Sequence, residues 1–210
     1  MIIPFLNNEG INIIDHLIIT HNDLDHIGGL ETLKNQKIIL NIYDNGNNKE
    51  KNKKTKSLHK PQKIQLEKNL ALTIIPPNKK LASKNKNNHS LVIKVNYYNQ
   101  SILLMGDLEK EGEAELLRQT INLQSNILKV GHHGSATSST PKFIKKVNPR
   151  ISIISCGTNN RYNHPHQKVL QTLKNTHILR TDLNGAIQIK FYKNKYKTSS
   201  FKKNKKALKI

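Results

Sequence analysis

Four side chains that commonly bind metal ions lie within six residues near the N-terminus: His21, Asp23, Asp25 and His26. They follow an apolar, β-branched run that is typical of a buried strand, and Gly28 and Gly29 come soon after them. Imidazole and carboxylate ligands together suit Zn²⁺ or Mn²⁺. Four ligands exceed the need of one open catalytic ion, so the spacing predicts two adjacent divalent ions, roughly 3.5–4 Å apart. The alternative is a polar turn that happens to contain these residue types.

Two further motifs lie at predicted strand ends and flank glycines. Asp107 follows Gly106, where its carboxylate is expected either to bridge two metals or simply to cap the next helix. His132 and His133 lie between two glycines. One of them is expected to bind metal, and we assign this role to His132 while the sequence leaves the choice open. The neighbouring His133 then serves as a general acid or a phosphate contact.

Hydroxyl residues follow the histidine pair and lead into a predicted helix. Ser135 and Ser138 are expected to contact a substrate phosphate at the N-terminus of that helix. A second polar loop after the next strand contains Arg161, Tyr162, His164 and His166. An arginine beside an aromatic residue can hold a phosphate and stack a base, so this loop is a second candidate for substrate binding. Ordinary helix capping is the alternative for both loops.

The periodicity of the chain predicts the elements that position these loops. Strands are expected at 13–20, 37–43, 70–75, 91–97, 101–105, 127–130, 150–156, 178–181 and 186–192, and helices at 30–35, 108–119, 141–147 and 166–174. The mixture favours an α/β protein with helices outside two packed sheets. We expect one domain over 1–192 with solvated Lys/Asn-rich loops near 44–63 and 78–88, followed by a frayed basic tail over 193–210.

The formal net charge of +21 favours a polyanionic partner such as nucleic acid or an anionic membrane surface. Heavy use of lysine, asparagine and isoleucine with little arginine would also follow from codon bias in an AT-rich genome. The single cysteine, Cys156, excludes an internal disulfide. No apolar run approaches the ~20 residues that cross a bilayer, so a soluble chain is expected.

Taken together, the motifs resemble the metallo-β-lactamase superfamily, and more closely the C-terminal hydrolase domain of the ComEC family of competence proteins. The matching segments are THNDLDHIGG, Asn88-x-Ser90, LLMGDLEKEGE, LKVGHHGSATSS, NRYNHPH and RTDLNGAI, in the order of that family. The resemblance implies an αββα sandwich with a metal site at one edge. It also implies that the ligands are His21, Asp23, Asp25, His26, Asp107 and one of His132 and His133.

The same resemblance implies a nuclease that degrades DNA during competence-related uptake, with two Mn²⁺ or Zn²⁺ ions holding the scissile phosphate. Asp25 would orient the attacking water, and His133 or a loop residue would assist the leaving group. DNA is the implied partner, together with a membrane channel that would be encoded separately. The family domain is associated with the membrane on its outer side.

Family members usually carry strands and a Gly-Gln-Gly-Asp-like motif before the segment that matches THNDLDHIGG. We therefore expect the sandwich to lack its first strands, which would expose a sheet edge and reduce the core. This leaves two alternatives to a nuclease: a catalytically silent, DNA-contacting remnant of a split protein, and a small-molecule hydrolase of the same superfamily.

Overall fold

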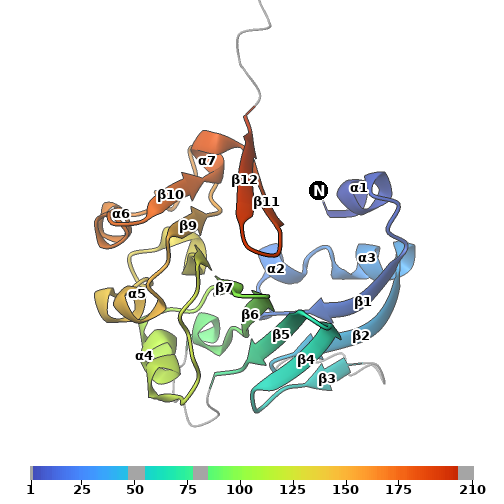
Figure 1. Cartoon of the computed structure of the whole chain (residues 1–210). Coiled ribbons are helices and arrows are strands. Elements are labelled where there is room, and N and C mark those ends of the chain that lie inside the picture. The colour runs from blue at the N-terminus through green and yellow to red at the C-terminus, as the bar shows by residue number, and fades with distance from the viewer. Residues whose placement is uncertain (1, 47–54, 78–84, 203–210) are drawn as a thin grey trace, which may run out of the picture.

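The computed structural model describes residues 2–46, 55–77 and 85–202, and its central element is a seven-stranded mixed sheet (Figure 1). The strands run in the order β10-β9-β8-β7-β6-β5-β4. They span β4 (Gln62–Glu67), β5 (Leu70–Ile75), β6 (Val92–Tyr97), β7 (Gln100–Leu104), β8 (Ile127–Lys129), β9 (Ile151–Ile154) and β10 (His177–Arg180). The strands from β7 to β10 are parallel, so their carboxyl ends meet at one edge.

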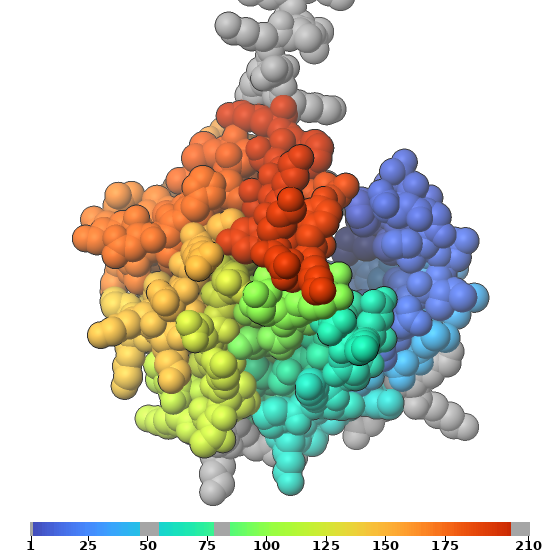
Figure 2. Space-filling model, in the orientation of Figure 1, coloured from blue at the N-terminus to red at the C-terminus, as the bar shows by residue number. Residues whose placement is uncertain are grey.

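A second, parallel sheet of three strands packs against the β4–β5 side of the large sheet. It contains β1 (Ile13–Ile18), β2 (Ile38–Asp44) and β3 (Thr55–Ser57). Tyr43 of β2 and Ile74 of β5 belong to one buried cluster, which joins the two sheets. The remaining strands, β11 (Ala186–Phe191) and β12 (Tyr196–Phe201), form an antiparallel hairpin. Figure 2 shows this hairpin in red, with a hollow between it and the N-terminal segment in blue.

Helices cover the outer faces of both sheets. The helices are α1 (Ile2–Asn8), α2 (Leu24–Ile27), α3 (Leu30–Gln36), α4 (Lys110–Arg118), α5 (Pro141–Val147), α6 (Gln167–Thr172) and α7 (Thr181–Asn184). The largest apolar cluster joins α4, α5 and α6 to the sheet, with Leu116, Phe143 and Val169 as helix members. The predicted arrangement of helices outside two packed sheets is confirmed.

Alternation along the central strands explains how both faces of the large sheet become covered. Leu103 and Leu128 pair across β7 and β8 and belong to the helix-facing cluster. Their neighbours Ile102 and Ile127 pair likewise and pack with the β11–β12 hairpin. Because strand side chains alternate between faces, a strand that is buried on both sides reads as a continuous apolar run.

Two of the predicted irregular segments contain regular structure. The expected loop over 44–63 includes β3 and the start of β4, while residues 47–54 lie outside the described ranges. The tail beginning at residue 193 was expected to be frayed, but β12 pairs with β11 along its whole length. Residues 203–210 of this tail and 78–84 of the other predicted loop are outside the described ranges. Strands β3 and β12 are polar in sequence and exist through pairing with β2 and β11, so an apolar strand pattern does not reveal them.

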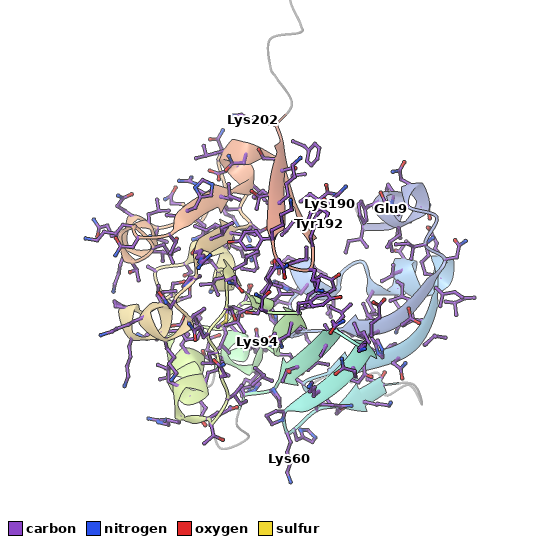
Figure 3. All side chains as sticks on the ribbon, in the orientation of Figure 1. Glu9, Lys60, Lys94, Lys190, Tyr192 and Lys202 are labelled. Atoms are coloured by element: carbon purple, nitrogen blue, oxygen red, sulfur yellow. The ribbon has the colours of Figure 1, made fainter. Side chains whose placement is uncertain are left out.

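Lysine side chains are found on different parts of the molecule. In Figure 3 the labelled side chains of Lys60, Lys190 and Lys202 lie at well separated places. Within the described residues, no helix combines the length and apolar composition that crossing a membrane requires.

Candidate metal centre

The metal-competent side chains come together at the edge where β1, β7 and β8 end. Four of them, Asp25, His26, Asp107 and His133, each offer a ligand atom, and these atoms all lie within 4.8 Å of one another. The chain brings them from three segments that are far apart in sequence. Such convergence at strand carboxyl ends is the usual location of sites in open α/β sheets.

Asp107 lies at the middle of this group. Its Oδ2 is 3.3 Å from Nε2 of His26 and 3.6 Å from Nε2 of His133. Asp25 Oδ2 faces the same two nitrogens, each at 3.4 Å. Two carboxylates and two imidazoles therefore enclose one point with a mixed N/O ligand set, which suits a divalent transition metal.

His21 and Asp23 extend the group on the other side of Asp107. His21 Nε2 is 3.8 Å from Oδ2 of Asp23 and 3.9 Å from Oδ2 of Asp107. His21 is 1% exposed, and its Nε2 has no hydrogen-bond partner among the described residues. Oδ1 of Asp107 is likewise buried without a partner in the described part of the chain. Orphaned polar atoms are costly to bury, so these residues fit a metal that would satisfy them.

Threonine and a backbone carbonyl orient three of the imidazoles. Thr20 Oγ1 lies 3.1 Å from Nδ1 of His21 and 3.4 Å from Nδ1 of His26. His133 Nδ1 lies 2.8 Å from the carbonyl oxygen of Ser155, which can only accept, so Nδ1 carries the proton. Each ring then directs Nε2 toward the carboxylates. Outer contacts of this kind fix the tautomer and angle of metal-binding histidines.

The protonation of the cluster follows from burial and from its charges. Burial lowers the pKa of His21, which favours the neutral imidazole that binds metals. The hydrogen bond to Asp107 raises the pKa of His26. Burial opposes ionisation of Asp107, but the hydrogen bond with His26 and the charge of His133 outweigh it and lower its pKa to about 2. The hydrogen bond between His26 and Asp107 therefore favours the protonated imidazole and the ionised carboxylate, and a divalent cation would displace that proton.

Close backbone packing explains the glycine before Asp107. Gly106 has φ +54°, and a Cβ there would lie 3.1 Å from Cβ of Ser90 and 3.2 Å from Cβ of Thr20. The turn that presents Asp107 therefore packs directly against the segment that carries Thr20 and His21. Glycine meets both demands because it lacks a Cβ and tolerates positive φ.

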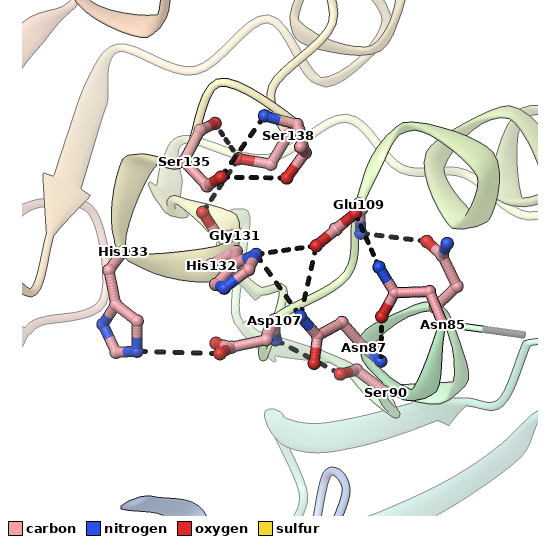
Figure 4. A network of polar contacts seen from close by, with 12 residues as sticks. Asn85, Asn87, Ser90, Asp107, Glu109, Gly131, His132, His133, Ser135 and Ser138 are labelled. Carbon is pink, nitrogen blue, oxygen red and sulfur yellow. Dashed lines mark hydrogen bonds and ion pairs between the residues drawn. The ribbon is translucent and has the colours of Figure 1, made fainter. Parts of the chain in front are cut away.

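In the structure His133, rather than His132, lies beside the carboxylates of the metal cluster. Both have left-handed backbone conformations, with φ 44° at His132 and 54° at His133, and their ring centroids are 6.3 Å apart. His133 faces the carboxylates of the cluster, whereas His132 places Nδ1 2.9 Å from Oε1 of Glu109 (Figure 4). The expectation of His132 as ligand and His133 as the free acid does not fit this geometry, because consecutive left-handed residues turn the two rings apart.

The hydroxyl loop is not presented as a phosphate site. Ser138 Oγ donates to the carbonyls of Gly131 and Ser135, and both serines are more than nine-tenths buried. The expected helix N-terminus is occupied as well, because the Glu113 carboxylate accepts from the backbone N–H groups of Ser139 and Thr140. The expectation that Ser135 and Ser138 bind phosphate is therefore not supported: Ser138 bonds within the loop, and Glu113 rather than a loop hydroxyl caps the helix.

The second polar loop does reach the candidate site. His164 lies with its ring centroid 5.7 Å from that of His132 and 5.4 Å from that of His166. Tyr162 is 57% exposed and stacks on His164, with their ring centroids 5.7 Å apart. The Arg161 guanidinium lies over the Tyr162 ring, 4.6 Å from its centroid. A line of rings thus leads from His132 outward to an exposed cation.

Sequence reasoning missed Glu109 and Thr20. Each lies one or two residues from a candidate ligand, which is where outer partners of metal ligands are often found. Asp182, in the matching segment RTDLNGAI, pairs with Arg180 at 2.6 Å and accepts from Sγ of Cys156.

Solved structures share the fold. The E377D mutant of CmlA β-hydroxylase aligns with a TM-score of 0.53 and 10% identity over 90% of this chain and 45% of its own. A Parabacteroides distasonis structure named as a metal-dependent hydrolase aligns with a TM-score of 0.53 and 14% identity over 82% and 76%. At these identities the likeness concerns the fold alone.

Curated relatives match nearly the whole chain. ComE operon protein 3 of Bacillus subtilis is 41% identical over 95% of this chain, and Recombination protein 2 of Haemophilus influenzae is 30% identical over 92%. Competence protein ComA of Neisseria gonorrhoeae is 30% identical over 89%. The chain spans only 24–27% of the length of these relatives. The model of the metallo-beta-lactamase superfamily matches residues 2–158, and the chain therefore belongs to that superfamily.

Proposed function

We propose that this chain is a metal-dependent nuclease that hydrolyses DNA phosphodiesters in competence-related DNA uptake. The observation that carries the proposal is the cluster in which Asp107 faces His26 and His133 on one side and His21 on the other. A carboxylate shared by two ligand groups is suited to bridge two ions. The names of the three relatives supply the link to competence and recombination.

Divalent cations bound there would polarise the phosphate and make a water molecule more acidic, toward a pKa of ~7. In the hydrolysis, water oxygen adds to phosphorus, the bond to the leaving oxygen breaks, and one proton of water ends on that oxygen. Asp25, whose side chain is 63% exposed, would orient the attacking water. His132, which lies beside the cluster and outside the ligand group, would contact the leaving oxygen.

The outer loop supports a phosphate-bearing polymer as substrate. Arg161 and Tyr162 are exposed, and the rings of His164 and His132 connect them to the cluster. A base can stack on an exposed tyrosine while a guanidinium meets the backbone phosphate. The net charge of +21 has the sign that attracts this substrate.

Incubation of the full chain with single- and double-stranded DNA in Mn²⁺ or Zn²⁺ tests the proposal. We expect degradation that EDTA stops and that Asp25→Ala reduces by at least about 10²-fold, the range for loss of a group that acts in proton transfer. Asp15→Asn, an exposed carboxylate on β1, is the matched control and is expected to leave the rate unchanged. Intact DNA under all conditions, with salt-dependent binding, would favour the silent DNA-contacting alternative.

A further inference from the structure

Beside the metal cluster, one buried carboxylate gathers three polar side chains. Glu109 is 7% exposed, and its Oε1 lies 2.9 Å from Nδ1 of His132. Asn87 Nδ2 donates to the same oxygen at 3.1 Å, and Asn85 Nδ2 donates to Oε2 at 2.9 Å (Figure 4). Several donors converge on one acceptor in a protein interior, so the carboxylate has a well-defined position and orientation.

The contact with Glu109 determines which nitrogen of His132 remains for substrate. A carboxylate accepts hydrogen bonds, so Nδ1 of His132 is the donor and carries a proton. Nε2 is then the nitrogen that can meet another molecule. The ring lies between the cluster, with the His133 centroid at 6.3 Å, and the outer loop, with the His164 centroid at 5.7 Å.

The segments 107–109 and 132–133 together form two neighbouring carboxylate–histidine pairs. Asp107 and His133 enter the metal cluster, while Glu109 and His132 pair beside it. Asp107 and Glu109 are two residues apart, and the left-handed backbone at His132 and His133 turns their rings apart. The two pairs therefore diverge. Left-handed backbone at two consecutive non-glycine residues is strained, and such strain is typical of functional sites.

We propose that Glu109 is a positioning residue: it holds His132 by Nδ1 so that Nε2 faces the leaving oxygen of a phosphodiester bound at the metal centre. This role rests on the proposed nuclease function. Glu109 acts through His132, in the way that a carboxylate fixes the tautomer and angle of an imidazole at other catalytic sites.

A purely structural role is the competing explanation. Glu109 also ties the turn η1 (Lys86–His89) to the segment before α4, through Asn85 and Asn87. Loss of its carboxylate would therefore lower stability whether or not His132 touches substrate. The two roles differ in one respect: a positioning role disappears when His132 is absent, and a structural role does not.

A double-mutant cycle on the full chain in Mn²⁺ separates them, with bis(p-nitrophenyl) phosphate as the reporter diester. We expect Glu109→Gln to lower kcat by about 10- to 100-fold, the usual effect of removing an outer partner. KM and the number of bound Mn²⁺ ions should stay within about twofold of the wild-type values, because the ligand group is intact. In a His132→Ala background, Glu109→Gln should leave kcat unchanged.

Glu115→Gln is the matched control, since Glu115 is an acid on α4 that pairs with Arg118 at 3.2 Å; it should keep the wild-type kcat. If Glu109→Gln unfolds, Glu109→Asp replaces it, because its shorter side chain withdraws the carboxylate from Nδ1 and should lower kcat alike. An equal fall of kcat with and without His132, or no fall at all, overturns the positioning role alone. A wild-type chain that hydrolyses no diester overturns the proposed function and this role with it.

Discussion

At the scale of single residues, the histidine pair shows where sequence reasoning ends. The residue types and their glycine flanks predicted one ligand in the pair, but both side chains have the same chemistry. The choice depends on φ 44° and 54° at His132 and His133, which turn one ring to the carboxylates and the other to Glu109. No local pattern encodes this, because the surrounding strands and the Ser155 carbonyl determine it.

Because His133 and not His132 faces the carboxylates, replacing each histidine should affect metal binding differently. His133→Ala should weaken Mn²⁺ binding by more than about tenfold, since loss of an outer partner alone commonly costs that much. His132→Ala should leave the affinity within about twofold, because the Nδ1 contact with Glu109 keeps that ring outside the ligand group. Isothermal titration of metal-stripped protein measures both. The reverse ranking would restore His132 as the ligand.

At the scale of elements, strands with a strong apolar pattern were predictable and polar ones were not. The strands expected over 91–97 and 101–105 are present as β6 and β7, and the helix expected over 108–119 is present as α4. In contrast, β12 has four consecutive polar residues, 197–200, and exists through its pairing with β11. Likewise, the N-terminus of α5 is capped by Glu113 from another helix, a partner that only the tertiary fold supplies.

The turn after β10 provides a pH test of one such tertiary element. Arg180 hydrogen bonds to Asp182 and lowers the pKa of that carboxyl below its ordinary value of 3.8. A depressed folded-state pKa contributes stability above the unfolded pKa, and that stability is lost as the pH falls through the folded value. We expect Asp182→Asn to lower the free energy of unfolding by about 1.5–3 kcal/mol at neutral pH.

Urea unfolding across pH measures this effect. The difference between Asp182→Asn and wild type should shrink steadily below about pH 4, where the unfolded carboxyl is protonated. Exposed Asp15 on β1 supplies the control, and Asp15→Asn should change stability by less than about 0.5 kcal/mol. A difference that stays constant down to acid pH would show that the Arg180 contact is not its cause.

At the scale of the whole molecule, the net charge of +21 has the sign that attracts DNA, and the labelled lysines of Figure 3 lie at well separated places. Codon bias in an AT-rich genome would also produce many lysines, so the charge alone does not establish a DNA interface. The salt dependence of DNA binding distinguishes a DNA interface from lysines that have no binding role, because each neutralised phosphate releases counterions.

With EDTA present to prevent cleavage, the affinity for duplex DNA should fall about 10³-fold between 50 and 200 mM salt, as for roughly six phosphate contacts. Fluorescence anisotropy of a labelled duplex gives the slope. Arg161→Ala should reduce the slope by about one contact, whereas Lys145→Ala on α5 should not. Identical slopes for both variants would exclude the outer loop from the interface.

The rate of single-stranded DNA degradation during titration of the metal-stripped chain with Mn²⁺ tests the central claim most directly. The shared carboxylate of Asp107 predicts no cleavage without metal and a rate that rises until two ions are bound per chain. DNA that stays intact at every Mn²⁺ concentration, or a full rate in the metal-stripped chain, would contradict a two-metal nuclease.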